Sequence, residues 1–442
     1  MNLNKILFLA LMAVLSFSCQ DKLELEPAQS ISGDLATTSE SNIQNILIGT
    51  YDEAGQGDSH GGELQVIADL LGNDDQVTWG GTFLSPAEIV NKTILPDNGF
   101  ISGFWNNVYE VINQANIVVD NISVVTSDAD KKNRIEGEAK FLRALCYFEL
   151  NRHFASGDMG VPLRLTGILD YSVDLSKSRD NTSAVYAQVV ADLESASQLL
   201  PDDNGIFADK YSALALLARV QLYLGNYAAA REAANDVLAN SGHALSSSFA
   251  AAFNHDADNE EDLFTFQVTS QTGTNSLITY YASEGNGGRG GDITVNDEYV
   301  AIFDDPNDER ASFFYESPQN GGRLTAKFIN QFGNVPILRI AEMHLIRAEA
   351  NFEEGTSVGL APLDEINALR ARSGAAALGA LTTEVIFAER ERELAFEGFF
   401  IHDLKRSQGT AAGISYDSPQ LVLPIPQGEL DTNPSMVQNP NY

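Results

Sequence analysis

Apolar residues recur at helical spacing along most of this chain. In the stretch 41–54, Ile43, Leu47 and Tyr51 follow one another at intervals of four residues, so they lie on one face of an α-helix. Polar residues fill the positions between them, as expected for a helix that packs one side against a core. The same period predicts further helices over 104–122, 132–154 and 183–201.

Two segments predict pairs of helices. Residues 211–242 contain two helical patterns joined by the turn Leu-Gly-Asn-Tyr, and the alanines after this turn allow the helices to pack closely. Residues 339–374 are a looser copy of the same arrangement. Such pairs are typical of tetratricopeptide repeats, in which neighbouring helices must stack to bury their apolar faces. The pattern therefore predicts a mainly α fold, with a scaffold of tetratricopeptide-type helix pairs.

Two long segments interrupt the helical pattern. Residues 55–103 and 244–336 are rich in Gly, Asn, Ser and Asp, and only the stretch Glu-Glu-Asp-Leu-Phe-Thr-Phe-Gln-Val-Thr-Ser within the second segment has the pattern of a strand. Irregular segments of this length in a compact protein are usually functional. We therefore expect long irregular loops and short strands inserted into the helical scaffold, and we expect the ligand site within these insertions.

The N-terminus has the pattern of an exported protein. Lys5 precedes an apolar run over 6–17 that is too short to span a membrane, and small residues then lead to Cys19. This pattern predicts a signal peptide over 1–18, lipid attachment at Cys19 and a lipid-linked leader over 19–40. An ordinary signal peptide with an incidental cysteine is the alternative. No later segment is apolar enough to span a membrane, so we expect anchoring by lipid only.

Composition narrows the choice of partners. The formal net charge is −34, and a surface this acidic repels nucleic-acid phosphates and anionic lipid headgroups, so nucleic acid is excluded as a partner. The spacing of the cysteines and histidines fits no metal site, and we predict neither a metal nor a cofactor. Surface or capping positions are expected for the six histidines, His60, His153, His243, His255, His344 and His402.

Three short motifs match sites that bind or transform ligands. Gly-Asp-Ser-His-Gly at 57–61 fits the nucleophile elbow of a serine hydrolase with Ser59 as nucleophile, but no strand precedes it. Gly-Asn-Gly-Gly-Arg-Gly at 285–290 fits a dinucleotide fingerprint, but no helix follows it. The acidic run at 256–260 lacks the glycine and the final glutamate of a calcium loop. We interpret all three as loops or turns.

The densest charged stretch, Ala-Glu-Arg-Glu-Arg-Glu-Leu-Ala-Phe-Glu-Gly, lies near the C-terminus. Glu389, Glu393 and Glu397 recur every four residues, and Arg390 and Arg392 can each pair with a glutamate three residues away. Acid–base catalysis by these carboxylates would also need a cleft and a facing partner. We therefore interpret the stretch as a helix held in place by its charges, with no catalytic residues.

Several segments together resemble the RagB/SusD family of Bacteroidetes outer-membrane lipoproteins. The resemblance covers nearly the whole chain. One departure is the inserted Ala-Ser-Gly-Asp-Met at 155–159, which affects a single loop. The segments that carry the resemblance are the leader CQDKLELEP, the helix FWNNVYEVINQAN, the helix EAKFLRALCYFELNRHF followed by GVPL, the segments ILRIAEMHLIRAEA and INALRARSG, the charged ERERELAFEG with HDLKR, and the tail LPIPQGELDTNPSMVQNPNY.

The resemblance implies a binding protein with no catalysis, exposed at the cell surface and anchored in the outer membrane. Such proteins capture oligosaccharides and deliver them to a SusC-like TonB-dependent transporter. The implied division is an N-terminal SusD-like helical part over 41–243 and a C-terminal RagB/SusD part over 244–442, packed together as one globular unit. The alternatives are a peptide-binding member of the family and, from another class, a secreted hydrolase that uses Ser59.

A sugar site needs an aromatic ring to stack against and nearby polar side chains to bind hydroxyl groups. Trp79 lies outside any apolar period, between glycines and a polar run, and is the first candidate platform. Tyr280 and Tyr281 form the second, and only one of them could serve if they lie on a strand. The complete set of predicted ligand residues is Asn73, Asp74, Asp75, Trp79, Tyr280, Tyr281, Asn286 and Arg289.

Overall fold

The computed structural model describes residues 36–442, so the expected signal peptide, Cys19 and most of the leader lie outside the described residues. The longer helices are α3 (Glu40–Ala54), α6 (Gly99–Asp120), α7 (Ala129–Phe154), α8 (Thr182–Leu199), α9 (Lys210–Tyr223), α10 (Tyr227–Asn240), α13 (Ile340–Glu354), α14 (Pro362–Arg372) and α15 (Thr383–Leu394). The shorter helices are α4 (Glu63–Gly72), α5 (Leu84–Val90), α11 (Ser276–Tyr281), α12 (Asp297–Val300), α16 (Phe400–Ser407) and α17 (Gln427–Thr432). The prediction of a mainly α fold is confirmed.

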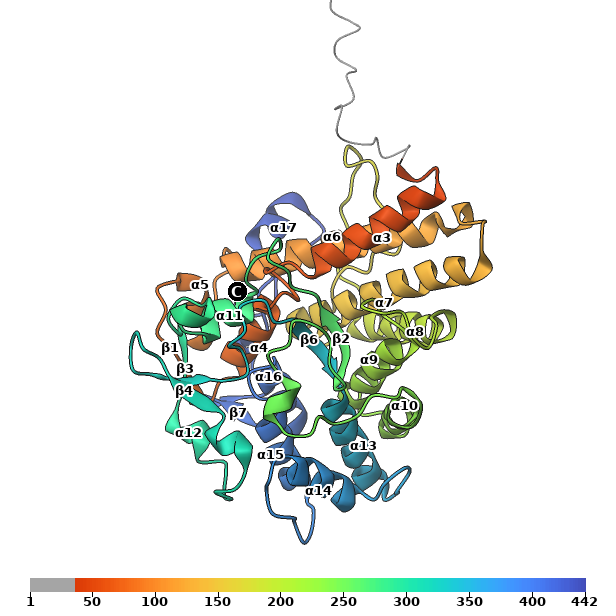
Figure 1. Ribbon diagram of the computed structural model, residues 1–442. Coiled ribbons are helices and arrows are strands. Elements are labelled where there is room, and N and C mark those ends of the chain that lie inside the picture. Colours follow the sequence, from red (N-terminus) through yellow and green to blue (C-terminus); the bar gives the residue numbers. More distant parts are fainter. Residues whose placement is uncertain (1–35) are drawn as a thin grey trace, which may run out of the picture.

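The described strands are short and form four antiparallel pairs. These are β1 (Val77–Trp79) with β3 (Ile293–Val295), β2 (Asp262–Phe266) with β6 (Val335–Arg339), β4 (Phe314–Glu316) with β5 (Arg323–Thr325), and β7 (Thr410–Ala411) with β8 (Ile414–Ser415). Single-turn 3₁₀ helices lie at Ile122–Val124, Ala250–Ala252, Glu284–Asn286, Glu309–Ser312 and Pro419–Leu421. Most strands belong to the insertions, which lie along one side of the helical scaffold in Figure 1.

The helices pack in sequence order as antiparallel neighbours. In Figure 1, α3, α6 and α7 form one layer, while α9 and α10 lead to α13 and α14, as the helix-pair pattern predicts. Local sequence sets where they start. The Asn98 side chain accepts hydrogen bonds from the backbone N–H groups of Phe100 and Ile101, so α6 begins at Gly99 rather than at residue 104. Asp209 and Ser212 form a capping box that begins α9.

Helix α4 is absent from the sequence-based prediction, which assigns 55–103 to an irregular insertion. Nine of its ten residues are buried, so it is a core helix. Its sequence Glu-Leu-Gln-Val-Ile-Ala-Asp-Leu-Leu-Gly is apolar on nearly every face, and a helix buried all round has no polar stripe to reveal its period. Helix α4 packs against α16 and α11, and it supports the segments that form the candidate site.

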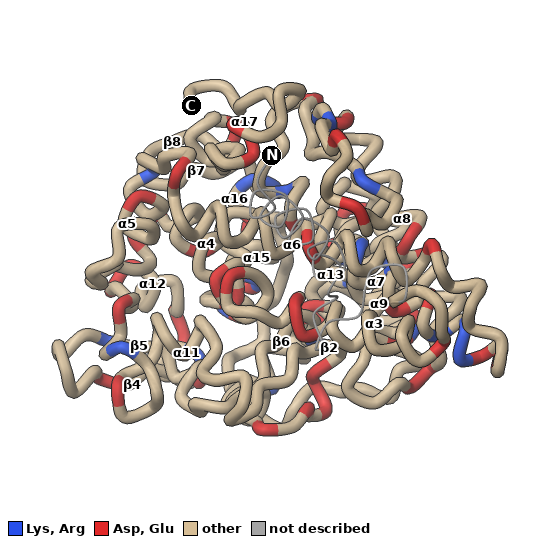
Figure 2. The backbone as a smooth tube through the Cα atoms, turned by 90° about the horizontal axis from the view of Figure 1, so that it is seen from above, with Lys and Arg blue, Asp and Glu red and all other residues tan. Residues whose placement is uncertain are grey.

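Charge is spread over the whole molecule. Figure 2 shows acidic positions on almost every part of the backbone and fewer basic ones among them. Within residues 36–442, none of the helices combines the length and the apolar composition needed to cross a membrane.

Candidate functional site

Two insertions that were predicted separately meet through β1 and β3. The antiparallel register places Trp79 opposite Ile293, and the backbone N–H of Gly80 donates to the carbonyl of Asp292 at 2.7 Å. Four rings gather at this junction, which we call the aromatic cluster: Trp79, Phe83, Phe100 and Tyr280. The ring centres of Trp79, Phe83 and Phe100 lie 5.8, 6.5 and 5.7 Å from the centre of Tyr280.

The aromatic cluster is buried at its centre and exposed at its edge. Tyr280 is 4% exposed and forms the base, whereas Phe83 is 42% exposed and Trp79 is half-buried. The guanidinium of Arg289 lies 4.1 Å from the centre of the Phe83 ring, and its Nε donates to Asp292 at 2.9 Å. An exposed ring face beside a fixed guanidinium and a carboxylate can stack against the C–H face of a ligand and bind its hydroxyl groups.

Sequence features specific to this segment position the rings. A Cβ at Gly81 would collide with the indole of Trp79, so glycine is required where the chain folds back over the ring. On the facing insertion, the Asn275 side chain accepts from the N–H of Ile278 and caps α11, which carries Tyr280 toward Trp79. Tyr280 and Tyr281 therefore lie on a short helix rather than on a strand, because this cap starts a helix at Ser276.

A half-buried carboxyl lies beneath the aromatic cluster. The Tyr280 hydroxyl donates to Glu63 at 3.4 Å. Burial, together with the nearby charge of Asp58, raises the pKa of Glu63 to about 8. At neutral pH this carboxyl is therefore mostly protonated, and it adds little negative charge to a site that already holds the Arg289–Asp292 ion pair.

Tyr281 serves the core instead of the surface. It is fully buried, its hydroxyl donates to Asp69 at 3.1 Å, and its ring packs against Phe328 and Phe396. With no exposed face, it offers no platform for a ligand, contrary to the prediction. Its neighbour Tyr280 points from the same helix into the aromatic cluster, because successive residues of a helix point in directions about 100° apart.

The polar residues predicted beside Trp79 have different surroundings. Asn73 is buried, and its amide bonds both the N–H and the carbonyl of Val77, so it holds the turn before β1. Asp74 is exposed and accepts from the N–H of Ala412 at 2.7 Å. Asp75 adopts a positive φ of 69° in the same turn. On the other insertion, Asn286 is half-buried and ends a 3₁₀ turn.

Asp74 also lines a large cleft of about 840 Å³. The cleft lies between the α9–α10 turn, α13, α15 and α16, away from the aromatic cluster. Tyr223, Tyr227 and Phe387 contribute rings to its wall, but most of its ionisable residues are acidic, including Glu353. Because the whole chain is strongly acidic, this excess of acids does not distinguish the cleft from the rest of the surface.

The serine-hydrolase alternative requires an exposed nucleophile beside a base. Ser59 is fully buried, and its single hydroxyl proton is directed to the side-chain oxygen of Asn107, with the carbonyl of Ala54 also within hydrogen-bond distance. A helix precedes it and a turn follows, so the strand–turn–helix of a nucleophile elbow is not formed. Within the described residues, Ser59 has no histidine as a hydrogen-bond partner, and its geometry does not support catalysis.

The two remaining motifs are structural loops. Residues 285–290 run from a 3₁₀ turn into β3 without a helix, as the sequence predicts. In the acidic run, Asp258 accepts hydrogen bonds from Thr265, Gln267 and Asn334, which fixes the turn before β2.

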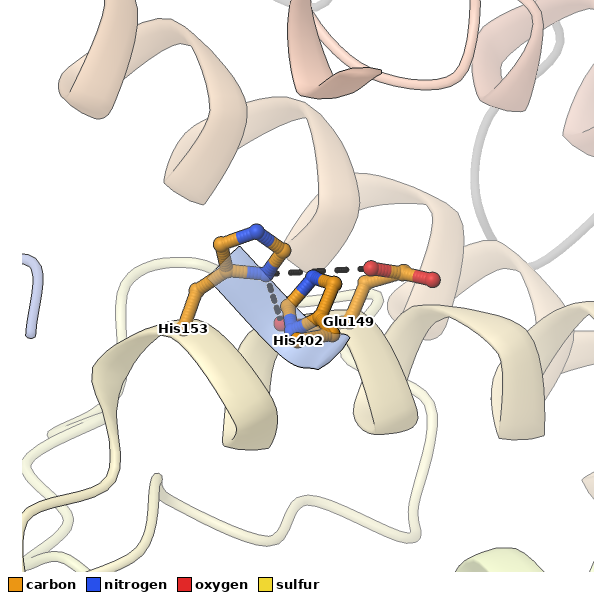
Figure 3. Close-up of side chains that lie close together, drawn as sticks. All are labelled: Glu149, His153 and His402. Carbon is orange, nitrogen blue, oxygen red and sulfur yellow. Dashed lines mark hydrogen bonds and ion pairs between the residues drawn. The ribbon is translucent and has the colours of Figure 1, made fainter. Parts of the chain in front are cut away.

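Three histidines depart from the prediction of surface or capping positions: His60, His153 and His402 are buried. Figure 3 shows Glu149 and His153 on one helix with His402 reaching them from another, and the rings of His153 and His402 lie 4.7 Å apart. Sequence spacing could not reveal the pair of His153 and His402, because the two residues lie far apart in the chain and only the fold brings them together. Burial and the nearby charge of Arg152 keep the pKa of both rings well below its usual range.

This donor set does not suit a cation. Both oxygens of Glu149 already accept from Arg152, at 2.7 and 2.6 Å. The Nδ1 atom of His153 lies 2.8 Å from the carbonyl oxygen of Glu149, so Nδ1 carries the proton and only Nε2, which points away from this bond, keeps a lone pair. The three side chains are therefore interpreted as core residues.

The charged stretch near the C-terminus forms a buried ionic network. Helix α15 ends at Leu394, so Glu389 and Glu393 share its inner face while Glu397 lies beyond it. Glu389 pairs with Arg392 as predicted, at 3.3 Å, but Arg390 pairs with Asp403 instead of a glutamate. The cations that surround the buried carboxylates come from elsewhere in the chain, from Arg310, Lys327, Arg339, Arg370 and Arg372.

Two family models match this chain. Residues 22–222 match a model described as starch-binding associating with outer membrane, and residues 321–442 match the model of the SusD family. Among curated proteins, SusD-like protein P2 of Formosa agariphila is 27% identical over 508 aligned residues, which cover 99% of each chain. SusD-like protein P38 of the same organism is 27% identical over 233 residues, 52% of this chain and 44% of that protein.

Solved structures share the fold. A SusD superfamily protein from Bacteroides thetaiotaomicron superposes with a TM-score of 0.78 at 24% identity, covering 93% of this chain and 100% of that chain. A laminarin-binding SusD-like protein superposes with a TM-score of 0.75 at 24% identity, covering 92% of this chain and 100% of that chain. The two matching models, the full-length relative and the shared helical fold agree, and the chain belongs to the RagB/SusD family.

Proposed function

We propose that this protein captures an oligosaccharide at the aromatic cluster on the cell surface and delivers it to a SusC-like TonB-dependent transporter in the outer membrane. The observation that carries the proposal is the exposed ring of Phe83, which contacts Arg289 and Tyr280, beside the half-buried Trp79 that packs on the same Tyr280. The family description of starch binding in association with the outer membrane supports the class of ligand and the location. The laminarin-binding structural neighbour supports it too.

The site residues follow from this geometry. Trp79 and Phe83 provide the stacking faces, and Arg289 with Asp292 binds hydroxyl groups at the rim, while Tyr280 supports the rings from below. Asn286 lies on the loop that carries Arg289 and is a further rim residue. Lipid attached to Cys19 anchors the protein, and the transporter is its partner.

Binding is tested by isothermal titration with a panel of oligosaccharides, including laminarin fragments, and a panel of peptides. Phe83→Ala and Trp79→Ala are each expected to weaken glycan binding about tenfold or more, because each removes apolar surface that the ligand covers. Leu360→Ala, an exposed apolar residue elsewhere, is the control and should bind normally. Binding of peptides alone would contradict the proposal and favour the peptide-binding alternative.

The anchor and the partner are tested in cells. Cys19→Ala is expected to release the protein from the membrane fraction, and the tagged wild-type protein is expected to copurify with the transporter after mild detergent extraction. A soluble wild-type protein that never copurifies with an outer-membrane barrel would contradict this part of the proposal.

A further inference from the structure

A second part of the surface combines exposed apolar side chains with a cavity. The segment 162–176, which we call the strap, crosses α6 on its way from α7 to α8. Among the twelve large apolar side chains that are exposed in the described residues, four belong to the strap: Leu165, Leu169, Tyr171 and Val173. Phe83 and Leu84 of the candidate site are also among the twelve, so two regions hold half of them.

The strap covers a cavity of about 520 Å³ against α6 and α17. This volume lies within the usual range of small-molecule sites. Rings of Trp105 and Tyr109 line it from α6, and Glu429 and Asn433 line it from the α17 side. The mixture of aromatic rings, amides and carboxylates resembles the chemistry expected for a sugar site.

Hydrogen bonds to α6 hold the strap in place. The Tyr109 hydroxyl donates to the carbonyl of Pro162 at 2.9 Å. Asn113 bonds both the N–H and the carbonyl of Ile168, at 2.7 and 3.1 Å, and Asn116 donates to the carbonyl of Arg164 at 3.0 Å. The wall of the cavity is therefore formed before any ligand arrives, which lowers the entropy cost of binding.

Other groups around the cavity are not used by these bonds. Tyr171 is 64% exposed, and only its hydroxyl is engaged, as the acceptor from Asn113 at 3.0 Å, so its ring face remains available. Asn106 lines the cavity, and its side chain has no hydrogen-bond partner among residues 36–442. Glu110 lies one helical turn further along the same face and is exposed.

This cavity is separate from the aromatic cluster, although both use α6. Phe100 and Tyr109 are nine residues apart, which is about two and a half helical turns, so they point to opposite faces of α6. Phe100 faces Tyr280 in the aromatic cluster, whereas Tyr109 faces the strap. A ligand at one site therefore does not occupy the other.

We propose that the strap cavity is a second carbohydrate-binding site, with the Tyr171 ring as its platform and Asn106 and Glu110 as hydroxyl ligands. This inference rests on the proposed function, because it assumes that the natural ligand is a glycan. A long glycan that engages both sites of one protein gains affinity through effective concentration.

The experiment measures stoichiometry and affinity by isothermal titration with the oligosaccharide that the wild-type protein binds best, and with its parent polysaccharide. The wild-type protein is expected to bind two short oligosaccharides. Trp79→Ala and Tyr171→Ala are each expected to bind one, and the polysaccharide is expected to bind about tenfold more weakly to either variant. Tyr171→Phe keeps the ring and Leu169→Ala alters the strap outside the cavity, so both controls should match the wild type.

A second measurement avoids substitutions that disturb the strap. Ligand should slow hydrogen exchange of the wild-type protein at 162–176 as well as at 77–83.

Full loss of binding in Trp79→Ala, with unchanged binding in Tyr171→Ala and no protection of the strap, would overturn the second site and leave the proposed function intact. A wild-type protein that binds no glycan would overturn both. Normal glycan binding by Tyr171→Ala with lost copurification of the transporter would make the strap a protein-docking surface and overturn the proposal.

Discussion

Asp69 illustrates how a single buried carboxyl links the core to the candidate site. It is fully buried on α4, where it accepts from the Tyr281 hydroxyl and from the N–H of Gly398 at 3.1 Å each. Burial raises its pKa to about 7, although these hydrogen bonds oppose the shift. Asp69 thereby joins α11, which carries the tyrosines, to the segment that follows α15.

Asp69→Asn is expected to change how stability depends on pH. The carboxyl has a pKa near 3.8 in the unfolded chain and about 7 in the folded one, so the folded state binds the proton more tightly and this group lowers stability as pH rises from about 4 to 7. The unfolding free energy of the variant, relative to that of the wild type, should therefore increase by about 4 kcal/mol between pH 4 and pH 8. Urea unfolding at both pH values measures this, with exposed Asp75→Asn as the control. The same difference in unfolding free energy between variant and wild type at both pH values would contradict this prediction.

Glu393 has the opposite environment. Burial alone would raise its pKa, but the charges of Arg372, Arg339 and Arg310 outweigh burial and lower the pKa to about 2. Glu393→Gln leaves those guanidinium groups buried with less compensating charge and should cost about 3–5 kcal/mol of unfolding free energy at pH 7. The loss should shrink as pH falls from about 4.5 toward 2, where wild-type Glu393 also becomes neutral. Glu384→Gln, exposed on the same helix, should change chemical denaturation by less than about 0.5 kcal/mol.

At the scale of the element, α4 depends on close contact with α16. A Cβ at Gly72 would overlap the backbone of Phe400 and Ile401. Gly72→Ala must push the helices apart and should cost about 2 kcal/mol or more, despite the better helix propensity of alanine. Gly428 in α17 has no atom within 4 Å of the corresponding position, so Gly428→Ala should be neutral or slightly stabilising. Thermal unfolding of the two variants makes the comparison; equal melting temperatures would show that α4 and α16 can separate freely.

Some helices could be predicted from the sequence and others could not. Helices with one polar face, such as α3 and the α9–α10 pair, could be predicted from their period. The ends of such helices differ from the prediction by a few residues, because capping residues such as Asn98, which begins α6, lie outside the apolar pattern. The short helices α4 and α11 could not, since one is apolar all round and the other is only six residues long. Tertiary packing decides both, and no local pattern records it.

The candidate site could be predicted only in part, because tertiary packing also decides which of its residues come together. Trp79, Tyr280 and Arg289 were identified by residue type and loop context, and the structure brings them to one place through β1 and β3. Phe83 was missed, although the pair Phe83-Leu84 follows Gly80, Gly81 and Thr82 in the same loop as Trp79, which was a usable signal. Tyr281 was misassigned because its burial depends on Asp69, Phe328 and Phe396, which are distant from it in the sequence. The pairing of β1 with β3 joins two insertions about 200 residues apart, and the sequence of neither insertion alone indicates this pairing.

For the whole molecule, the two halves of the chain should unfold together. Helix α10 packs on α13 and α4 packs on α16 across the expected boundary at 243/244, and Arg219 binds Glu342 through two buried hydrogen bonds of 2.7 Å. A half that lost these contacts would expose a large apolar surface and leave Glu342 unpaired. We predict one calorimetric transition, with calorimetric and van't Hoff enthalpies in agreement. Circular dichroism reports on both halves, and the fluorescence of Trp79 and Trp105 reports on the N-terminal half and on its contacts with Tyr280 and Glu429 of the other half. The two signals should therefore give the same midpoint. Two separate transitions, or cooperative unfolding of an isolated 36–243 fragment, would contradict this prediction and define two independent domains.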